Sequence, residues 1–218
     1  MVELLGPAGA GKTTLLQTLR QRDPRAVTEL RTPEIARIAN LSRDVAPMLV
    51  PFLLRHRHDR WFSRLEMRSM AYLGAWRAAV LGLGRRTPPP LVLLDHGPIF
   101  RLALLREFGP ALAGDPAFAR WWERSLEAWA RLLDVVVLLD APDDVLQRRI
   151  DERARGHAVK GRPRDEVVEF VGRYRRAFAD ILGRCAGPVV LRFDTQSESA
   201  RRIADAVLSA LDASGARA

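Results

Sequence analysis

The stretch Gly6-Pro7-Ala8-Gly9-Ala10-Gly11-Lys12-Thr13 matches the pattern G-x-x-x-x-G-K-[ST] at every fixed position. An apolar run, Val2 to Leu5, precedes it, and a helical pattern containing Leu15, Leu16 and Leu19 follows it. In this strand–loop–helix context the glycines let successive backbone N–H groups converge on phosphate, because bulky side chains would block that approach. The stretch therefore predicts a loop that binds the phosphates of a nucleoside triphosphate.

Several parts of this loop have separate expected roles. The N-terminus of the following helix contributes a partial positive charge and Lys12 contributes a full one, so Lys12 is expected to act in catalysis as well as binding. The Thr13 hydroxyl is an oxygen ligand suited to Mg²⁺. The expected nucleotide-binding residues of the loop are Gly6, Ala8, Gly9, Ala10, Gly11, Lys12, Thr13 and Thr14.

Apolar runs and helical patterns alternate along the whole chain. The five apolar runs are 2–5, 26–30, 91–94, 134–139 and 189–193. The helical patterns are 13–22, 33–41, 45–83, 97–108, 115–133, 142–155, 163–183 and 197–212. This alternation predicts a parallel sheet covered by helices, a three-layer α/β/α fold of the P-loop NTPase type. No stretch is long enough to be a linker, so we expect residues 1–218 to form a single domain.

The longest helical pattern, 45–83, is expected to contain two helices. Pro47 and Pro51 interrupt its beginning, and its length exceeds that of an ordinary helix.

A carboxylate follows the third apolar run. Asp95 ends this run, and ligands bind at the carboxyl edge of open α/β sheets. It is expected to ligate Mg²⁺ or to accept a proton from an acceptor hydroxyl, although capping of the helix that starts near Pro98 is the alternative. His96 is a candidate for contact with the substrate, or it simply fills the turn. Asp140 also ends an apolar run, and capping of the next helix is the favoured role for it.

An arginine cluster follows the fourth apolar run. Arg149 and Arg153 are four residues apart and share one helix face, and Arg155 lies just beyond them. A basic segment that closes over a triphosphate would exclude water and neutralise charge on the phosphoryl group in transfer. We expect a lid-like segment at about 149–163, with Arg149 on the nucleotide and Arg153 and Arg155 in catalysis. The alternative is a solvated basic helix end.

Two further groups are candidates for the acceptor side. Glu29 and Arg31 are expected at the carboxyl end of the second strand, where ligands bind. Arg57 begins a basic stripe at helical spacing that continues through Arg60, Arg64 and Arg68, and a plain solvated face is the favoured interpretation of this stripe.

The composition excludes some other classes of protein. The chain has 218 residues and a formal net charge of +9, carried mainly by arginine because Lys12 and Lys160 are its only lysines. This charge is spread along the chain rather than gathered in a tail, which favours phosphate-bearing ligands over nucleic acid. No apolar run approaches the roughly 18 residues of a membrane span, and no signal peptide precedes the loop. We therefore expect a cytoplasmic protein without a membrane partner.

Taken together, these stretches resemble the thymidylate kinase and deoxynucleoside kinase group of P-loop kinases. The resemblance rests on the loop, on 29–33, on Asp95-His96-Gly97, on 139–142 and on 149–155. It implies a five-stranded parallel sheet, ATP with Mg²⁺ as the donor, and lid arginines on the phosphates. Members of the group usually carry arginine where this chain has His96, and Arg101, about one helical turn further on, is the candidate replacement.

The sequence thus favours a thymidylate kinase-like phosphotransferase that moves the γ-phosphoryl group of ATP to a nucleoside monophosphate or a nucleoside. The first alternative is a P-loop kinase for another small hydroxylated molecule, such as a sugar, an antibiotic or a cofactor precursor. The second is a nucleotide-operated regulatory ATPase. The expected partner is the small-molecule acceptor, and a homodimer is left open.

Overall fold

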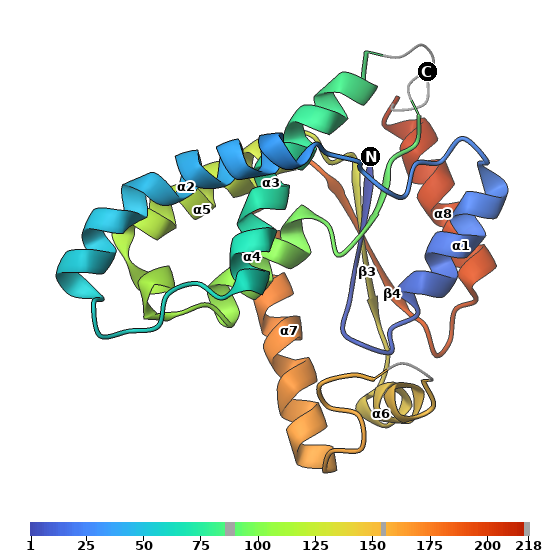
Figure 1. Cartoon of the computed structure of the whole chain (residues 1–218). Helices are drawn as coiled ribbons and strands as arrows, with labels where there is room; N and C mark the ends of the chain where they lie inside the picture. The colour runs from blue at the N-terminus through green and yellow to red at the C-terminus, as the bar shows by residue number, and fades with distance from the viewer. Residues whose placement is uncertain (86–89, 154–155, 216–218) are drawn as a thin grey trace.

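The computed structural model describes residues 1–85, 90–153 and 156–215. Four strands form one sheet in the order β2-β1-β3-β4, and every neighbouring pair is parallel. Their bounds are β1 Val2–Leu5, β2 Leu93–Asp95, β3 Val135–Asp140 and β4 Val189–Asp194. Helices cover both faces of the sheet, which confirms the predicted α/β class with a parallel sheet (Figure 1).

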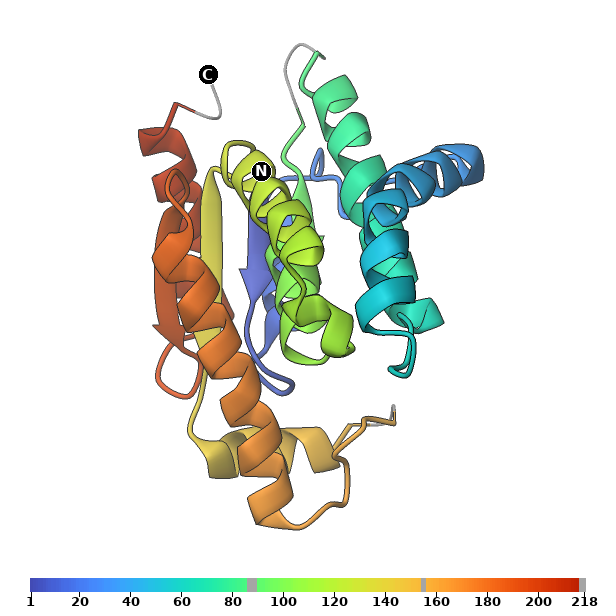
Figure 2. The same ribbon diagram turned by 90° about the vertical axis from the view of Figure 1, so that its left-hand side faces the viewer.

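The helices form two layers around this sheet. α1 (Lys12–Arg22) and α8 (Ala200–Ala213) pack together on one face, while α4 (Pro98–Glu107), α5 (Pro116–Ala130) and α7 (Arg164–Arg184) lie toward the other (Figure 1). The helical pair α2 (Glu34–Arg55) and α3 (Arg64–Leu83) packs outside α4 and α5. α6 (Asp143–Asp151) follows β3 and lies beyond the carboxyl ends of the strands (Figure 2), and a short 3-10 turn, Ala111–Gly114, precedes α5.

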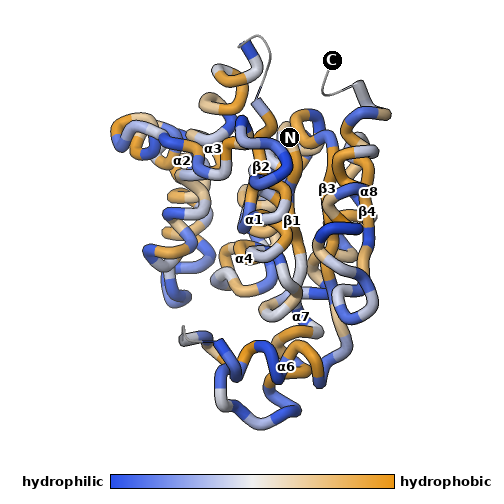
Figure 3. Tube along the Cα trace, turned by 90° about the vertical axis from the view of Figure 1, so that its right-hand side faces the viewer, coloured by the Kyte–Doolittle hydropathy of each residue, from blue (hydrophilic) through white to orange (hydrophobic). Residues whose placement is uncertain are grey.

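Side-chain alternation along the strands explains why both faces are covered. Val2 and Leu4 of β1 join the core on the α1 and α8 side, whereas Leu5 joins the core formed with α4, α5 and α7. β3 lies between β1 and β4, and hydrophobic residues recur along β1 and β3 (Figure 3). A strand with both faces covered must be apolar at nearly every position, as 135–139 is.

The predicted strand at 26–30 is wrong. Within the described residues this segment makes one isolated parallel bridge, in which Val27 pairs with Val92. The Val27 N–H donates to the Leu91 carbonyl at 2.8 Å, and the Val27 carbonyl accepts the Leu93 N–H at 2.9 Å. Beyond the bridge Glu29 and Arg31 are exposed, and Leu30 is only partly buried against the core, so little apolar surface supports further pairing. The described sheet therefore has four strands rather than five.

The two helices expected within 45–83 are present, but the interruption expected at the beginning of this region is not. α2 runs unbroken through Pro47 and Pro51, and the two helices are separated by 56–63 instead. Buried Met48, together with Phe52 against Trp61 at 4.3 Å between ring centroids, gives packing that offsets the lost N–H donors. Arg57 and Arg60 lie in the loop, so the predicted continuous basic stripe does not form.

Ser63 begins α3 with a reciprocal cap. Its Oγ accepts the Glu66 N–H at 3.3 Å, and Glu66 Oε2 accepts the Ser63 N–H at 2.6 Å. The sequence signal for this helix start was therefore present in Ser63-Arg64-Leu65-Glu66. Among the described residues, no helix is both long and apolar enough to cross a membrane.

Candidate active site

The glycine-rich loop joins β1 to α1 and is packed from outside by β3 and α6. Gly6 has φ 143°, and a Cβ there would lie 2.2 Å from the Leu139 carbonyl oxygen. Gly9 has φ 87°, and a Cβ there would lie 3.0 Å from the Leu146 carbonyl oxygen. Both positions therefore need glycine. No side chain caps α1 at Gly11, which leaves the first amides of the helix for an external anion.

Lys12 lies inside this loop. Its Nζ donates to the Gly6 carbonyl at 2.7 Å and to the Pro7 carbonyl at 2.9 Å. The residue is 8% exposed, and burial lowers the pKa of Lys12 to about 8. The carboxylate of Asp95 acts against this shift and the guanidinium of Arg153 adds to it. Lys12 is thus within electrostatic reach of both predicted catalytic partners.

Asp95 ends β2 beside the loop. The parallel register pairs it with Leu4, two residues before Gly6. Its Oδ1 is buried and has no hydrogen-bond partner in the part of the chain that the structure describes. Such an atom is costly unless it gains a partner, so it marks a site for a metal ion, a proton or a ligand donor.

His96 holds an uncommon backbone conformation next to this carboxylate. Its φ is 55°, which is rare for a residue other than glycine. Its Nδ1 lies 3.7 Å from Asp95 Oδ1, and its ring meets Phe100 edge-on with centroids 4.4 Å apart. Desolvation lowers the pKa of His96 and outweighs the Asp95 carboxylate, which acts to raise it. The nearby cations Lys12, Arg101 and Arg153 add to the lowering. A neutral imidazole is therefore favoured at the turn.

Glu3 supports this turn from β1, a role that the sequence analysis missed. Its two carboxylate oxygens accept the Ile99 N–H at 3.0 Å and the Phe100 N–H at 2.9 Å, so it caps α4 from another strand. Burial raises the pKa of Glu3 to about 8. A Cβ at Gly97 would lie 2.8 Å from the Glu3 side chain, which explains the glycine. The sequence feature that could have indicated this role is the single acidic residue, Glu3, within an apolar strand.

The lid-like region contributes Arg149 and Arg153. Arg149 donates to Thr195 Oγ1 at 2.8 Å, to the Thr195 carbonyl at 3.0 Å and to the Gly9 carbonyl at 3.3 Å. These bonds join α6 to the loop and to the turn before α8. A cavity of about 450 Å³ lies here, lined by Thr13, Thr14, Arg149 and Arg153 among others. Arg155 lies outside the described residues.

Asp140 is engaged elsewhere. Arg175 of α7 donates to Asp140 Oδ2 at 2.8 Å and to Oδ1 at 3.0 Å, and it also reaches Asp143 Oδ1 at 2.5 Å. Asp140 Oδ1 accepts the Ala141 N–H at 2.8 Å. This carboxylate therefore ties α7 to the end of β3, and Asp95 is left as the better candidate for Mg²⁺.

The acceptor-side candidates are not brought together. Because the strand at 26–30 does not form, the sheet-edge argument for Glu29 and Arg31 loses its basis, and the structure shows no hydrogen bond or ion pair for either within the described residues. Arg57 is exposed in the 56–63 loop, where its Nε approaches His58 Nε2 at 3.0 Å. Arg101, in contrast, is partly buried between α3 and α4, where its Nη1 donates to Ser69 Oγ at 3.2 Å.

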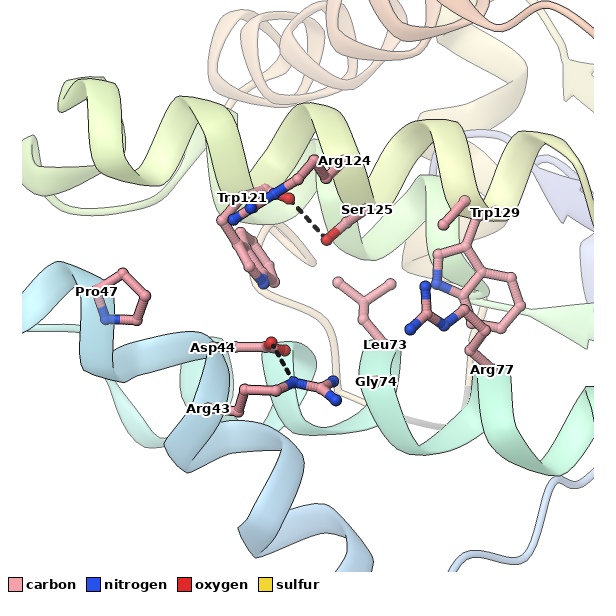
Figure 4. Close-up of a pocket in the computed structure, with 11 residues that line it drawn as sticks. Arg43, Asp44, Pro47, Leu73, Gly74, Arg77, Trp121, Arg124, Ser125 and Trp129 are labelled. Carbon is pink, nitrogen blue, oxygen red and sulfur yellow. Dashed lines mark hydrogen bonds and ion pairs between the residues drawn. The ribbon is translucent and has the colours of Figure 1, made fainter.

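A second cavity of about 400 Å³ lies between α2, α3 and α5 (Figure 4). Arg43 and Asp44 pair on one side with Nε and Oδ1 3.6 Å apart, Trp121 lines the other side, and Arg77 lies on α3. None of the residues that line it belongs to the glycine-rich loop. It is therefore separate from the site built around Lys12.

No protein-family model and no curated protein matches this chain. Among solved structures, the YorR protein from Bacillus subtilis in complex with phosphorylated GDP is 16% identical, with a TM-score of 0.52 over 97% of this chain and 95% of that one. Deoxyadenosine kinase from M. mycoides with bound dATP is 12% identical, with a TM-score of 0.51 over 95% of this chain and 98% of that one. The likeness shows that this chain has the fold of P-loop kinases. The narrower thymidylate kinase-like assignment stays a prediction.

Proposed function

We propose that this protein is a phosphotransferase that moves the γ-phosphoryl group of ATP, bound with Mg²⁺, to a nucleoside monophosphate or a nucleoside. The observation that carries the proposal is that Lys12 and Asp95 act on each other electrostatically at the glycine-rich loop. The lysine is buried in the loop, and the carboxylate has a buried oxygen without a hydrogen-bond partner among the described residues. Phosphoryl transfer depends on positioning and charge stabilisation, and this arrangement suits both.

The residues present fit a magnesium ion. Thr13 is exposed in the first turn of α1 and offers a hydroxyl oxygen, and Asp95 offers a carboxylate oxygen. Mg²⁺ prefers few protein ligands, with phosphate oxygens and water completing its shell. Thr13 and Asp95 would hold the ion, which would supply positive charge to the phosphates during transfer.

The remaining expected residues have roles around the triphosphate. In the proposal Lys12 and the first amides of α1 bind the phosphates, and Arg149 forms one wall of the nucleotide cavity. Arg153, which acts electrostatically on Lys12, neutralises the phosphoryl group in transfer. Arg155 is proposed for the same role from the sequence alone. The lid-like segment at 149–163 belongs to the single kinase-like domain that we propose for 1–218.

A second candidate function is phosphoryl transfer to another small hydroxylated molecule. Asp95 favours it, because a carboxylate oxygen without a hydrogen-bond partner in the described part of the chain is suited to accept the proton of an attacking hydroxyl. A phosphate acceptor arrives already deprotonated and needs cationic clamps more than a base. The identity of the acceptor group therefore separates the two candidates.

The test measures ADP release and phosphorylated product together. Purified protein is incubated with ATP and Mg²⁺ and with nucleosides, nucleoside monophosphates or unrelated alcohols, and Lys12→Ala is the inactive control. Acceptor-dependent ADP release that is lost in Lys12→Ala supports the proposal. Slow ADP release that no acceptor changes would favour a regulatory ATPase instead. Light scattering on the same preparation tests the open question of a homodimer.

A further inference from the structure

Three arginines from three different helices surround the phenol of Tyr72 on α3. Arg68, one turn earlier, donates to the Tyr72 hydroxyl oxygen from Nε at 3.2 Å and from Nη2 at 3.0 Å. Arg37 of α2 donates to the same oxygen from Nη1 at 3.3 Å. Arg101 of α4 stacks on the Tyr72 ring, with its Cζ 4.9 Å from the centroid. We call this group the Tyr72 arginine cluster.

The cluster holds positive charge that the described residues do not balance. None of its three arginines forms an ion pair with a carboxylate in the described part of the chain. The carboxylate of Glu3 acts on Arg101 electrostatically, but its oxygens are engaged by the amides of α4. Like charges held together without a counterion are unfavourable, so the cluster suits an anion.

Unused donors converge in the same region. Arg101 Nε is buried without a hydrogen-bond partner among the described residues, and so is the indole Nε1 of Trp76. The Arg101 guanidinium also stacks on Trp76, with Cζ 4.6 Å from the ring centroid. A guanidinium has about five N–H donors, and one phenol oxygen cannot satisfy those of Arg37 and Arg68. An oxyanion with several acceptor lone pairs could.

The position of the cluster links it to the acceptor side. Arg101 lies on α4, whose first turn Glu3 fixes directly after Asp95 and His96, and Arg101 acts electrostatically on His96. The donor nucleotide cavity is on the other side of the loop, between α6 and α8. An acceptor placed against Asp95 would therefore extend toward α3 rather than toward the donor.

We propose that the Tyr72 arginine cluster binds an oxyanion of the phosphoryl acceptor, a phosphate or a carboxylate group. This inference rests on the proposed function and narrows it: the acceptor is anionic, so a nucleoside monophosphate is preferred over a nucleoside. If the acceptor is not a nucleotide, it is a phosphate ester or a hydroxy acid rather than a neutral sugar. The Tyr72 hydroxyl donates to the bound anion while Arg37 and Arg68 clamp it.

The competing explanation is that these arginines only stack on aromatic rings and hold α2, α3 and α4 together. A purely structural role would change stability without changing the choice of acceptor. The variants Arg68→Gln and Arg37→Gln separate the two explanations, because Arg68 is exposed and Arg37 is only partly buried. Arg77→Gln is the matched control, since Arg77 is on the same helix but lines the separate cavity of Figure 4.

The first experiment compares matched acceptors at saturating ATP and Mg²⁺. The pairs are each nucleoside with its monophosphate, and a hydroxy acid with its neutral amide, so that phosphate and carboxylate are distinguished. Loss of a charged hydrogen bond should raise KM for the anionic member by about 10- to 100-fold in Arg68→Gln. KM for ATP and KM for the neutral member should stay unchanged, as should all values in Arg77→Gln.

A second measurement needs no turnover. Binding of AMP and of inorganic phosphate is followed by calorimetry in the Lys12→Ala background, which weakens phosphate binding at the loop, with and without Arg68→Gln. If AMP or phosphate binds and Arg68→Gln abolishes that binding, the anion site at the cluster is supported. If, in addition, no acceptor is ever phosphorylated, only the proposed function is overturned. Equal binding with and without Arg68→Gln, or equal KM for neutral and anionic acceptors, would overturn the cluster proposal while leaving a kinase in place.

Discussion

Replacing Lys12 with methionine is expected to abolish triphosphate binding and to stabilise the ligand-free protein. Burial lowers the pKa of Lys12 from its ordinary 10.5 to about 8, so the folded protein holds this charge unfavourably at pH 7. A shift of that size corresponds to about 3 kcal/mol. Methionine removes this cost of the buried charge, but it also removes the two hydrogen bonds to the Gly6 and Pro7 carbonyls. Loss of each hydrogen bond costs about 1 kcal/mol. A net gain of about 1 kcal/mol remains.

Thermal unfolding at several pH values checks this reasoning. A gain of 1 kcal/mol raises Tm by roughly 2–4 °C in a chain of this length. Between about pH 8 and 10.5 the unfolded wild-type chain binds more protons than the folded one, so the stability of the wild type rises with pH. The stability advantage of Lys12→Met over the wild type therefore becomes smaller in this range. Lys160→Met is the control, because this second lysine is exposed and loses only one exposed hydrogen bond, to the Arg153 carbonyl, so stability should change little. A variant less stable than wild type at pH 7, or a difference that does not narrow, would refute the argument.

Three further predictions concern the same site. Gly6→Ala should destabilise the protein by about 3 kcal/mol or more in denaturant titrations, because a Cβ would lie 2.2 Å from the Leu139 carbonyl oxygen. Gly82→Ala is the control: a Cβ at this position in α3 meets no atom within 4 Å, so the change should stabilise the protein by about 0.5–1 kcal/mol. Asp95→Asn should lower kcat by about 100-fold or more while triphosphate binding without Mg²⁺, followed by calorimetry, persists; unchanged kcat would remove Asp95 from the mechanism. Triphosphate affinity of the wild type should fall above about pH 8, by up to tenfold per unit, as Lys12 loses its proton, and a flat profile from pH 7 to 9.5 would contradict this.

Periodic and strictly local patterns were predicted well. The class of fold and most helices depended on spacing along the chain, and the structure confirms the α/β class and its parallel sheet. The clearest failures were the strand at 26–30 and the interruption expected at Pro47 and Pro51, whereas the two helices expected within 45–83 are present. In the first, a short apolar run had too little to bury to form a strand. In the second, packing of Met48 outweighed the helix-breaking preference of Pro47 and Pro51.

The sequence could propose candidate site residues only from local patterns, such as the glycine-rich loop or a position at the end of a strand. Asp95 could be found this way, because the end of an apolar run marks the edge where ligands bind. Glu3 was missed because its role depends on Ile99 and Phe100, which are far from it in sequence. The link between Arg175 and Asp140 was missed for the same reason.

The sequence by itself predicted a phosphate-binding loop at 6–13, because glycine, lysine and threonine at fixed spacing have their chemical meaning within a few residues of one another. It also determined the parallel α/β class, since strand and helix periods are local properties. Only the tertiary structure decided which of the many arginines lie close together. Arg37, Arg68 and Arg101 meet at Tyr72 because α2, α3 and α4 cross there, and no spacing along one helix could reveal that meeting. Charges separated in sequence interact through space, so their grouping follows from packing rather than from pattern.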